Sequence, residues 1–457
     1  MAAITADGMV LSQEDLYLTN MIRHFPPGHF NIEPYNIFMR GISETVTSST
    51  LALGNDNQLK FSKVLIWPPQ KFFQNKPHPM YPQYARERND TYGCEITATA
   101  SIVTVQNGKE VRVLNEENFV VGTVPTMIKS DFCNIKNFSK EELAAVGEDP
   151  DDIEGYFIVD GKEYCVLLQE QLVHNRTFIM HSTKDVPIIR MTVVSPEKMS
   201  SICVVATGKK KDTAIKYRFQ SLGKYKAVGN KIAKYRSVNF VYIFAALGIT
   251  DMNHIMQKVL KFIPAEEQYN CLITLSSSFK NYAALGDPVS AAIKIFRKKF
   301  SPTDKIDENL TDEMVSYLIR QTLQNDFFVN CNDIAIPEIE GETQEQYQER
   351  HLAMIFHTKL DMLCIMVAEY TRYLSGYRPL DDPDSWSNKI TKSAGSMMSA
   401  LFRSAWKKIV KDLGEQVRTS TTRAITQVSH FRQKLNSPII TDSFRDSFVT
   451  GGWGVKG

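Results

Sequence analysis

The sequence predicts an α+β fold, and three observations carry that prediction. Residues 156–159 form a short apolar run typical of a strand, and Asp160-Gly161 supplies residues that tolerate positive φ in a two-residue hairpin turn. Ser139-Lys-Glu-Glu142 is a capping box that predicts a short helix, which Gly147 can end. Residues 250–375 have a predominantly helical pattern. A strand, a capped helix and a tight hairpin therefore follow one another in the chain, which predicts an α+β fold.

The remaining elements follow in chain order. We expect a strand at 64–67, then a proline-rich stretch that leads to a loop at 80–92, and strands at 94–103, 122–128 and 163–168. Apolar residues at 240–247, closed by Gly248, predict a buried helix, and 352–374 predicts a long core helix. A further helix is expected at about 393–413, with Leu401, Ala405 and Ile409 on one face.

Composition places the chain among soluble globular proteins. It has 457 residues, which is enough for about two or three domains with cores of their own. Apolar residues make up 43% and charged residues 23%. The net charge of +2 gives no global attraction to nucleic acid, so any surface of that kind must be local.

Cysteine usage indicates a reducing compartment. The seven cysteines are scattered and odd in number, and no Cys-x-x-Cys pair occurs. The sequence therefore predicts neither a zinc ribbon nor a disulfide framework.

The sequence shows no pattern of a secretory signal or of a membrane span. The N-terminus lacks a basic segment followed by an apolar one, and the longest clean apolar run, 240–247, is far below the ~20 residues that span a bilayer. We expect an intracellular protein with no membrane partner.

Two stretches carry basic residues that are candidates for phosphate binding. Residues 208–236 contain many lysines and arginines but a single acidic residue, Asp212. Within this stretch, the apolar residues Ile215, Tyr217 and Phe219 alternate with polar residues along a predicted strand. On the helix at 393–413 a basic stripe lies roughly opposite the apolar face. Both sets also fit ordinary solvated charged faces. The candidate nucleic-acid-binding residues are Lys209, Lys210, Lys211, Lys216, Arg218, Lys224, Lys226, Arg403, Lys407 and Lys411.

Other candidate sites favour structural interpretations. Tyr217, Tyr225 and Tyr235 could stack on bases, although tyrosines that alternate in a strand more often belong to the core. The acidic run Asp381, Asp382 and Asp384 could hold a cation, but its spacing beside Pro383 fits turn chemistry better.

No sequence pattern predicts a catalytic residue. A phosphate-binding loop and a Gly-x-Ser-x-Gly nucleophile elbow are both absent from the sequence. Cys133 or Cys165 as a nucleophile has no supporting His or acid pattern, which favours buried thiols.

Several motifs, in a fixed order, resemble the second-largest (beta-type) subunit of multisubunit DNA-dependent RNA polymerases. The resemblance covers nearly the whole chain. The segments that carry it are Tyr81-Pro-Gln-Tyr-Ala-Arg-Glu-Arg-Asn-Asp-Thr-Tyr92, Val121-Gly-Thr-Val-Pro125, Gly147-Glu-Asp-Pro150, Gly155-Tyr-Phe-Ile158, Asp381-Asp-Pro-Asp384, Ala394-Gly395 and Thr450-Gly-Gly-Trp-Gly454.

The resemblance implies a domain organisation. Residues 1–195 and 376–435 would form a two-part protrusion of mixed strands and helices. Residues 196–375 would form an inserted, mostly helical lobe, and 436–457 would begin the fork.

The resemblance also implies a non-catalytic role in transcription by a nucleotidyltransferase. The chain would form one wall of the DNA cleft and help to hold DNA and the RNA–DNA hybrid. It would bind no cofactor itself, because the family's magnesium ions belong to the largest subunit. Implied partners are that largest subunit, a separate chain with the rest of the second-largest subunit, and other polymerase subunits. The compartment would be nucleus or cytoplasm. A large DNA virus is one implied source, and host cytoplasm, nucleus or virion would then apply.

Two other functions remain open from the residues alone. One is a stand-alone nucleic-acid-binding protein that uses the basic stretch 208–236. The other is a non-catalytic α+β scaffold for protein assembly. Tight, salt-sensitive binding by the isolated chain would favour the first, and its absence together with the absence of a polymerase partner would favour the second.

Overall fold

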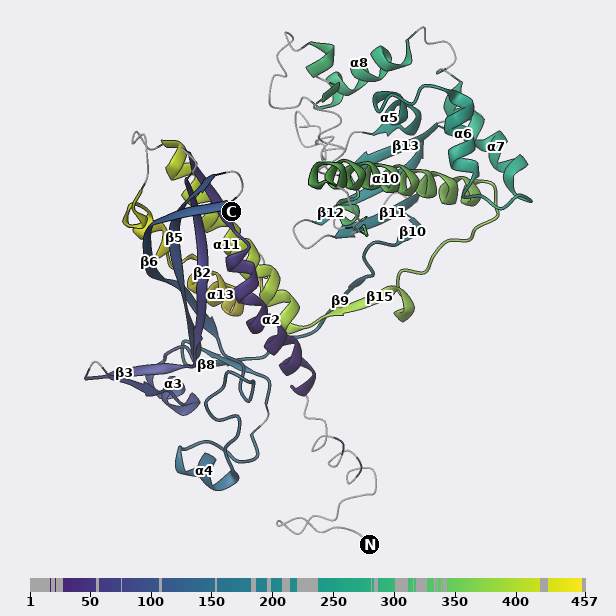
Figure 1. Ribbon diagram of the computed structural model, residues 1–457. Helices are drawn as coiled ribbons and strands as arrows, with labels where there is room; N and C mark the ends of the chain where they lie inside the picture. The colour runs from purple at the N-terminus through teal and green to yellow at the C-terminus, as the bar shows by residue number, and fades with distance from the viewer. Residues whose placement is uncertain are drawn as a thin grey trace, which may run out of the picture. The chain divides into compact units, whose positions relative to one another are not determined.

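The computed structural model divides the chain into two compact units (Figure 1). The first comprises Met1–Glu170 and Thr391–Gly457, and the second is the inserted segment Gln171–Ile390. The structure describes residues 17, 21 and 28–453, except for 55–56, 75, 107–108, 153, 182–185, 195–198, 208–213, 220–236, 281, 283–286, 301–310, 315, 318–326, 333, 335, 338, 340–342 and 420–425. The helices and antiparallel strands of the two units confirm the predicted α+β class.

The first unit is built on a four-stranded antiparallel sheet in the order β1-β2-β5-β6. Its strands are β1 (Thr50–Gly54), β2 (Asn57–Trp67), β5 (Gly93–Gln106) and β6 (Lys109–Pro125). The β5–β6 ladder runs from Gly93 opposite Pro125 to Gln106 opposite Lys109. Alternate β5 residues such as Ile96, Ala98 and Ala100 are buried, so one face of the sheet faces the core.

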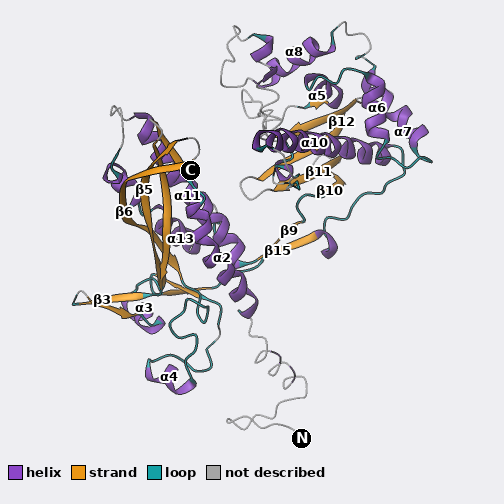
Figure 2. Ribbon diagram, viewed as in Figure 1, coloured by secondary structure: helices purple, strands orange, loops and turns teal. Residues whose placement is uncertain are grey.

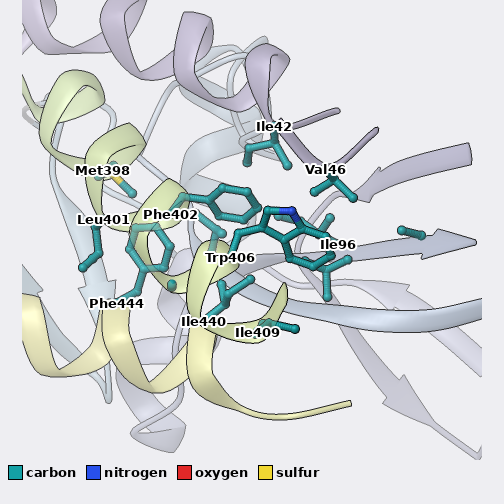
Figure 3. Packing of buried hydrophobic residues seen from close by; sticks show 14 of the residues in the cluster. Ile42, Val46, Ile96, Met398, Leu401, Phe402, Trp406, Ile409, Ile440 and Phe444 are labelled. Carbon is teal, nitrogen blue, oxygen red and sulfur yellow. The ribbon is translucent and has the colours of Figure 1, made fainter. Parts of the chain in front are cut away.

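Helices cover that buried face (Figure 2). They are α2 (His29–Thr47), α11 (Ala394–Thr419) and α13 (Ile439–Thr450), with the short α12 (Arg432–Leu435) beside them. Figure 3 shows Trp406 of α11 among Ile42, Val46 and Ile96, so the core joins both segments of this unit. The Trp406 indole donates a hydrogen bond from Nε1 to Ser49 Oγ (2.9 Å) and meets Phe61 edge-on with 5.0 Å between ring centroids.

Smaller elements lie at one end of this sheet. They are the hairpin β3 (Gln70–Phe73) and β4 (Lys76–Pro79), helix α3 (Pro82–Arg88), helix α4 (Lys140–Ala145), and the hairpin β7 (Phe157–Val159) and β8 (Lys162–Tyr164). Asp160 and Gly161 have φ values of 50° and 73°, which confirms the predicted turn. The Ser139 capping box is present with both hydrogen bonds, and Gly147 follows the helix at φ 81°.

Three sequence predictions differ from this structure. The expected loop at 80–92 contains α3, because Pro82 occupies the first turn, where its missing N–H costs no hydrogen bond. The strand expected at 163–168 ends at Tyr164, because the chain then turns toward α2, where Val166 accepts a hydrogen bond from Asn31 Nδ2 (3.3 Å). The strand expected to reach residue 128 ends at Pro125.

The second unit combines a five-stranded antiparallel sheet with helices. The sheet order is β10-β11-β12-β13-β14, with β10 (Thr177–His181), β11 (Pro187–Val194), β12 (Met199–Thr207), β13 (Ala214–Phe219) and β14 (Val238–Asn239). The helices are α5 (Phe240–Ala246), α6 (Met252–Leu260), α7 (Gln268–Ser276), α8 (Pro288–Phe300) and α10 (Gln344–Leu374). Gly248 follows α5 at φ 87°, as predicted.

The chain passes between the units at residues 170/171 and 390/391. The strands there, β9 (Gln169–Leu172) and β15 (Lys389–Lys392), pair in a two-stranded sheet. The boundaries expected at 195 and 375 fall inside the second unit. On the first side, β10 and β11 pair in register with β12 and thereby belong to its sheet. On the second side, the Asp381 N–H donates to the Ile179 carbonyl of β10 (2.9 Å).

Helix α10 is the main core helix of the second unit. By length and composition it could cross a membrane, with a mean hydropathy of 1.4 over its most apolar window. Its apolar residues Leu363, Cys364 and Val367 are buried in the core of this unit, as predicted for a core helix. Burial accounts for the apolar residues in this part of the helix, whereas Leu352 and Met354 near its start are exposed.

Candidate nucleic-acid interface

The basic stripe of α11 lies on the outer side of a core helix. Leu401, Ala405 and Ile409 are buried, as predicted, and anchor the helix in the first unit. Arg403 is half-buried, and Lys407 and Lys411 are exposed. Spacing of four residues places these three basic side chains along one side of the helix. The structure therefore places the three predicted basic residues of α11 on one side of this helix.

Local hydrogen bonds fix part of this stripe. The Arg403 guanidinium donates from Nε and Nη2 to Ser399 Oγ, at 3.2 and 2.7 Å. Lys411 Nζ lies 3.8 Å from Glu415 Oε1, one turn further on. An exposed pair of this kind contributes little to stability, so a phosphate can compete for Lys411 at small cost.

Helix α12 adds basic residues that the sequence analysis missed. It packs beside α11, and Gln416 Nε2 donates to the His430 carbonyl (2.8 Å) just before it. Arg432 and Lys434 are exposed on it. Two basic residues in one four-residue helix have no periodic pattern, so the sequence held no signal for them.

The second predicted set centres on β13. Ile215 and Tyr217 are fully buried while Lys216 is half-buried, which confirms the predicted alternation for these three residues. The Phe219 side chain lies outside the described residues. Lys216 lies opposite Val205 and Asn239 in the sheet. The backbone of Arg218 belongs to the same strand. The Arg218 side chain and residues Lys209, Lys210, Lys211, Lys224 and Lys226 lie outside what the structure describes.

Tyr217 is a core residue, so the suggestion that it stacks on bases is wrong. Its hydroxyl donates to the Leu363 carbonyl of α10 (2.6 Å), and its ring meets Phe327 edge-on at 5.8 Å. Burial raises the pKa of its phenol well above the usual value. Tyr225 and Tyr235 lie outside the described residues.

The acidic run at 381–384 makes hydrogen bonds within its own turn and with strand β10. Asp381 Oδ2 accepts from the Ile179 backbone N–H (2.7 Å) and from Arg378 Nη2 (3.1 Å). Asp382 Oδ1 accepts from the Asp384 N–H (2.9 Å), a local turn of the Asx type. Within the described residues, no group of three His, Cys, Asp or Glu side chains is arranged to hold a metal ion.

Arg86 joins the segments that carry the strongest sequence motifs. Its guanidinium contacts Glu148 (2.8 Å), Glu163 (2.7 Å) and the Tyr156 hydroxyl (2.6 Å). Burial alone would lower the pKa of Arg86, but the hydrogen bonds to Glu148 and Glu163 outweigh it and raise the pKa above its ordinary value. Arg86 therefore holds α3 to the β7–β8 hairpin as a permanent cation.

The cysteine near this network is a structural thiol. Cys133 is buried and lies 3.4 Å from the Tyr92 hydroxyl. Burial raises the pKa of its thiol, which disfavours the nucleophilic thiolate. The structural interpretation of Cys133 is thus supported over a nucleophilic one, whereas the expectation of a buried thiol is wrong for Cys165, which is exposed.

Comparison with protein families accounts for the order of these motifs. The family model described as RNA polymerase beta subunit matches residues 38–442, which span both units. The chain belongs to the RNA polymerase beta subunit family. The matched range includes α3, the Arg86 network, α10 and the basic stripe of α11.

Archaeal members of this family are similar to the chain over most of its length. DNA-directed RNA polymerase subunit Rpo2N of Halobacterium salinarum is 26% identical over 380 residues, which cover 82% of this chain and 64% of the relative. The Rpo2N subunit of Methanocaldococcus jannaschii is 24% identical over 437 residues, which cover 92% of this chain and 77% of the relative. Subunit Rpo2 of Saccharolobus solfataricus is 25% identical over 372 residues, which cover 81% of this chain and 29% of the relative. The chain thus spans less than two thirds of the Halobacterium relative.

Proposed function

We propose that this chain is the N-terminal part of the second-largest subunit of a DNA-directed RNA polymerase and forms one wall of its DNA cleft. The observation that carries the proposal is the family match over residues 38–442. The names of the archaeal relatives support it. In this proposal the first unit is the protrusion, the second contains the lobe, and the fork begins near residue 436.

The proposed work of the chain is to hold nucleic acid, with the chemistry performed elsewhere. The stripe of α11 would contact phosphates, since exposed lysines and a guanidinium fixed by Ser399 suit that role. Phosphoryl transfer would use magnesium held by the largest subunit. The chain itself would be inactive and would bind no cofactor.

The proposed partners follow from the same role. They are the largest subunit, a separate chain with the rest of the second-largest subunit, the other polymerase subunits, DNA and the RNA–DNA hybrid. We propose a reducing intracellular setting and, as the source, a large DNA virus. No membrane is involved in this proposal.

Native mass spectrometry of the tagged chain purified from its source tests the assembly. We expect co-purification with a larger chain bearing an Asp-x-Asp-x-Asp motif and with a chain homologous to the C-terminal part of beta-type subunits. The chain recovered alone, with tight salt-sensitive DNA binding, would favour a stand-alone binding protein instead. A complex that lacks polymerase chains and binds no DNA would favour the scaffold.

The role of α11 is tested in the assembled enzyme. The triple variant R403Q/K407Q/K411Q removes three positive charges, and K76Q/K140Q/K162Q removes three exposed charges from other elements of the same unit. Each lost phosphate contact reduces the magnitude of the slope of log K against log salt concentration by about 0.9. For R403Q/K407Q/K411Q the magnitude of this slope should therefore fall by up to about 3. Equal slopes for both variants would exclude α11 from the interface.

A further inference from the structure

A pocket of about 420 Å³ opens at the end of the first unit's sheet. It lies between the β3–β4 hairpin and the adjoining ends of β2 and β5. This volume falls within the range typical of small-ligand sites, roughly 300–1,000 Å³. Arg403, Lys407 and Lys411, the predicted nucleic-acid-binding residues that the structure describes in this unit, are not among its lining residues.

The walls of the pocket are apolar and partly aromatic. Trp67, Phe72, Pro77 and Met80 contribute to them. Trp67 is 44% exposed and Phe72 is 72% exposed, whereas Met80 is buried. A hydrogen bond from Trp67 Nε1 to Thr97 Oγ1 (3.0 Å) orients the indole. Two exposed aromatic rings beside a cavity form a surface that a ligand with apolar groups would cover.

Two carboxylates give the pocket its charge. Asp90 and Glu95 both line it and both are exposed. Asp90 Oδ1 accepts a hydrogen bond from the Thr91 N–H (2.7 Å). The nearby Lys71 alternates with Gln70 and Phe72 along β3 and therefore lies on the opposite face of this strand. Its ammonium group lies 4.1 Å from the centroid of the Tyr84 ring. Among the residues that the structure describes, none that lines the pocket is basic and could offset these two acids.

We propose that this pocket binds an arginine side chain, flanked by apolar residues, from a protein partner. The aliphatic stem would lie against Trp67 and Phe72, and the guanidinium would stack on an aromatic face and reach Glu95 or Asp90. A planar guanidinium suits both contacts, since it pairs with carboxylates and stacks on rings. The two acids repel phosphates, so this surface is distinct in chemistry from the basic stripe of α11.

The peptide acetyl-Leu-Arg-Leu-amide is the probe, and acetyl-Leu-citrulline-Leu-amide is the matched uncharged control. We would follow the Trp67 indole N–H by NMR in the full chain, with the Trp67→Phe variant assigning the signal. The arginine peptide should shift this signal saturably and bind at least fivefold more tightly than the citrulline peptide.

Variants of the chain complete the test. Glu95→Gln should weaken binding of the arginine peptide at least fivefold. Glu141 is an exposed acid on α4, and Glu141→Gln should leave binding of this peptide unchanged. Both sites are exposed, so both variants should fold. Equal binding of the two peptides, no loss in Glu95→Gln, or no saturable shift would each overturn the proposal. Competition by a single-stranded oligonucleotide at the Trp67 signal would contradict the assignment to a protein partner.

Discussion

Gly395 of α11 lies directly against the carbonyl oxygen of Pro34 in α2. A Cβ atom at position 395 would lie 1.9 Å from that oxygen. This distance is too short for any side chain, so only glycine fits at this position. The same crossing is fixed by the Ala394 N–H, which donates to Asn31 Oδ1 (3.1 Å). Glycine thus sets how closely the two segments of the first unit approach, although they lie some 360 positions apart in the sequence.

Gly395→Ala should destabilise the first unit because the backbone of α2 must move to make room. Overpacking of this kind costs about 1–3 kcal/mol in free energy of unfolding. The matched control is Gly414→Ala on the same helix, where the nearest side-chain atom to an added Cβ is 3.5 Å away. That change should stabilise by about 0.5–1 kcal/mol, because alanine favours helix. Urea unfolding of both variants measures the difference, and equal effects would show that the crossing is not tight.

Trp406 should contribute most to the core of the first unit. Trp406→Ala removes the largest fully buried side chain there and should cost about 3–5 kcal/mol. Ser49→Ala removes the acceptor for the indole N–H, together with the long hydrogen bond from Ser49 Oγ to the Thr45 carbonyl (3.4 Å), and should cost about 1–3 kcal/mol. Thermal unfolding of the full chain reports both. A larger effect for Ser49→Ala than for Trp406→Ala would contradict this ranking.

Local chemistry explains which elements could be predicted from the sequence. The Asp160-Gly161 turn and the Ser139 capping box depend on a few adjacent residues, and both occur as expected. Helix α3 was missed because the prolines around it indicate a loop, although Pro82 is acceptable in a first helical turn. The unit boundaries depend on which strands pair with β12, and that pairing has no local signature.

The functional surfaces likewise include some features that follow from local sequence and others that depend on the fold. The stripe of Arg403, Lys407 and Lys411 follows from helical periodicity and could be predicted. The partners of Arg86 lie 62 and 77 positions away, so its role emerges only from the fold. The pocket beside Trp67 likewise needs β3, β5 and the end of β2 to meet.

Arg86 should be essential to the packing of α3. Arg86→Ala leaves the carboxylate of Glu148 buried without its cation, which should cost about 3–5 kcal/mol. In Arg86→Ala/Glu148→Gln the buried charge is gone, so part of that loss should be recovered. Arg88→Ala, at an exposed position of the same helix, should change stability by less than about 0.5 kcal/mol. Additive effects of the Arg86 and Glu148 changes in a double-mutant cycle would rule out this coupling.

Glu267 and Arg372 should make the second unit sensitive to acid. Two hydrogen bonds from Arg372 to Glu267, at 2.6 and 3.0 Å, lower the pKa of that carboxyl. Its stabilising effect is therefore present above the unfolded pKa of about 4.3 and is lost as pH falls through the lower folded value. Glu267→Gln should lower the melting temperature at pH 7, and the difference from wild type should shrink below pH 4. A difference that stays constant across this range would exclude the ion pair as its cause.

Thiol reactivity should separate exposed from buried cysteines. Burial raises the pKa of Cys94 and of Cys364 to about 12, so both are thiols at pH 8, whereas Cys165 is exposed. Iodoacetamide at pH 8 should modify Cys165 at least tenfold faster than either buried cysteine in the folded chain, with mass spectrometry of peptides as the measurement. In urea the rates should converge, since unfolding restores the ordinary pKa of about 8.5. By the same linkage, the raised pKa values should reduce stability as pH rises above about 9, because the unfolded chain then loses protons first. Rapid modification of Cys364 in the folded chain would mean that α10 is exposed on that face and that the core of the second unit is packed differently.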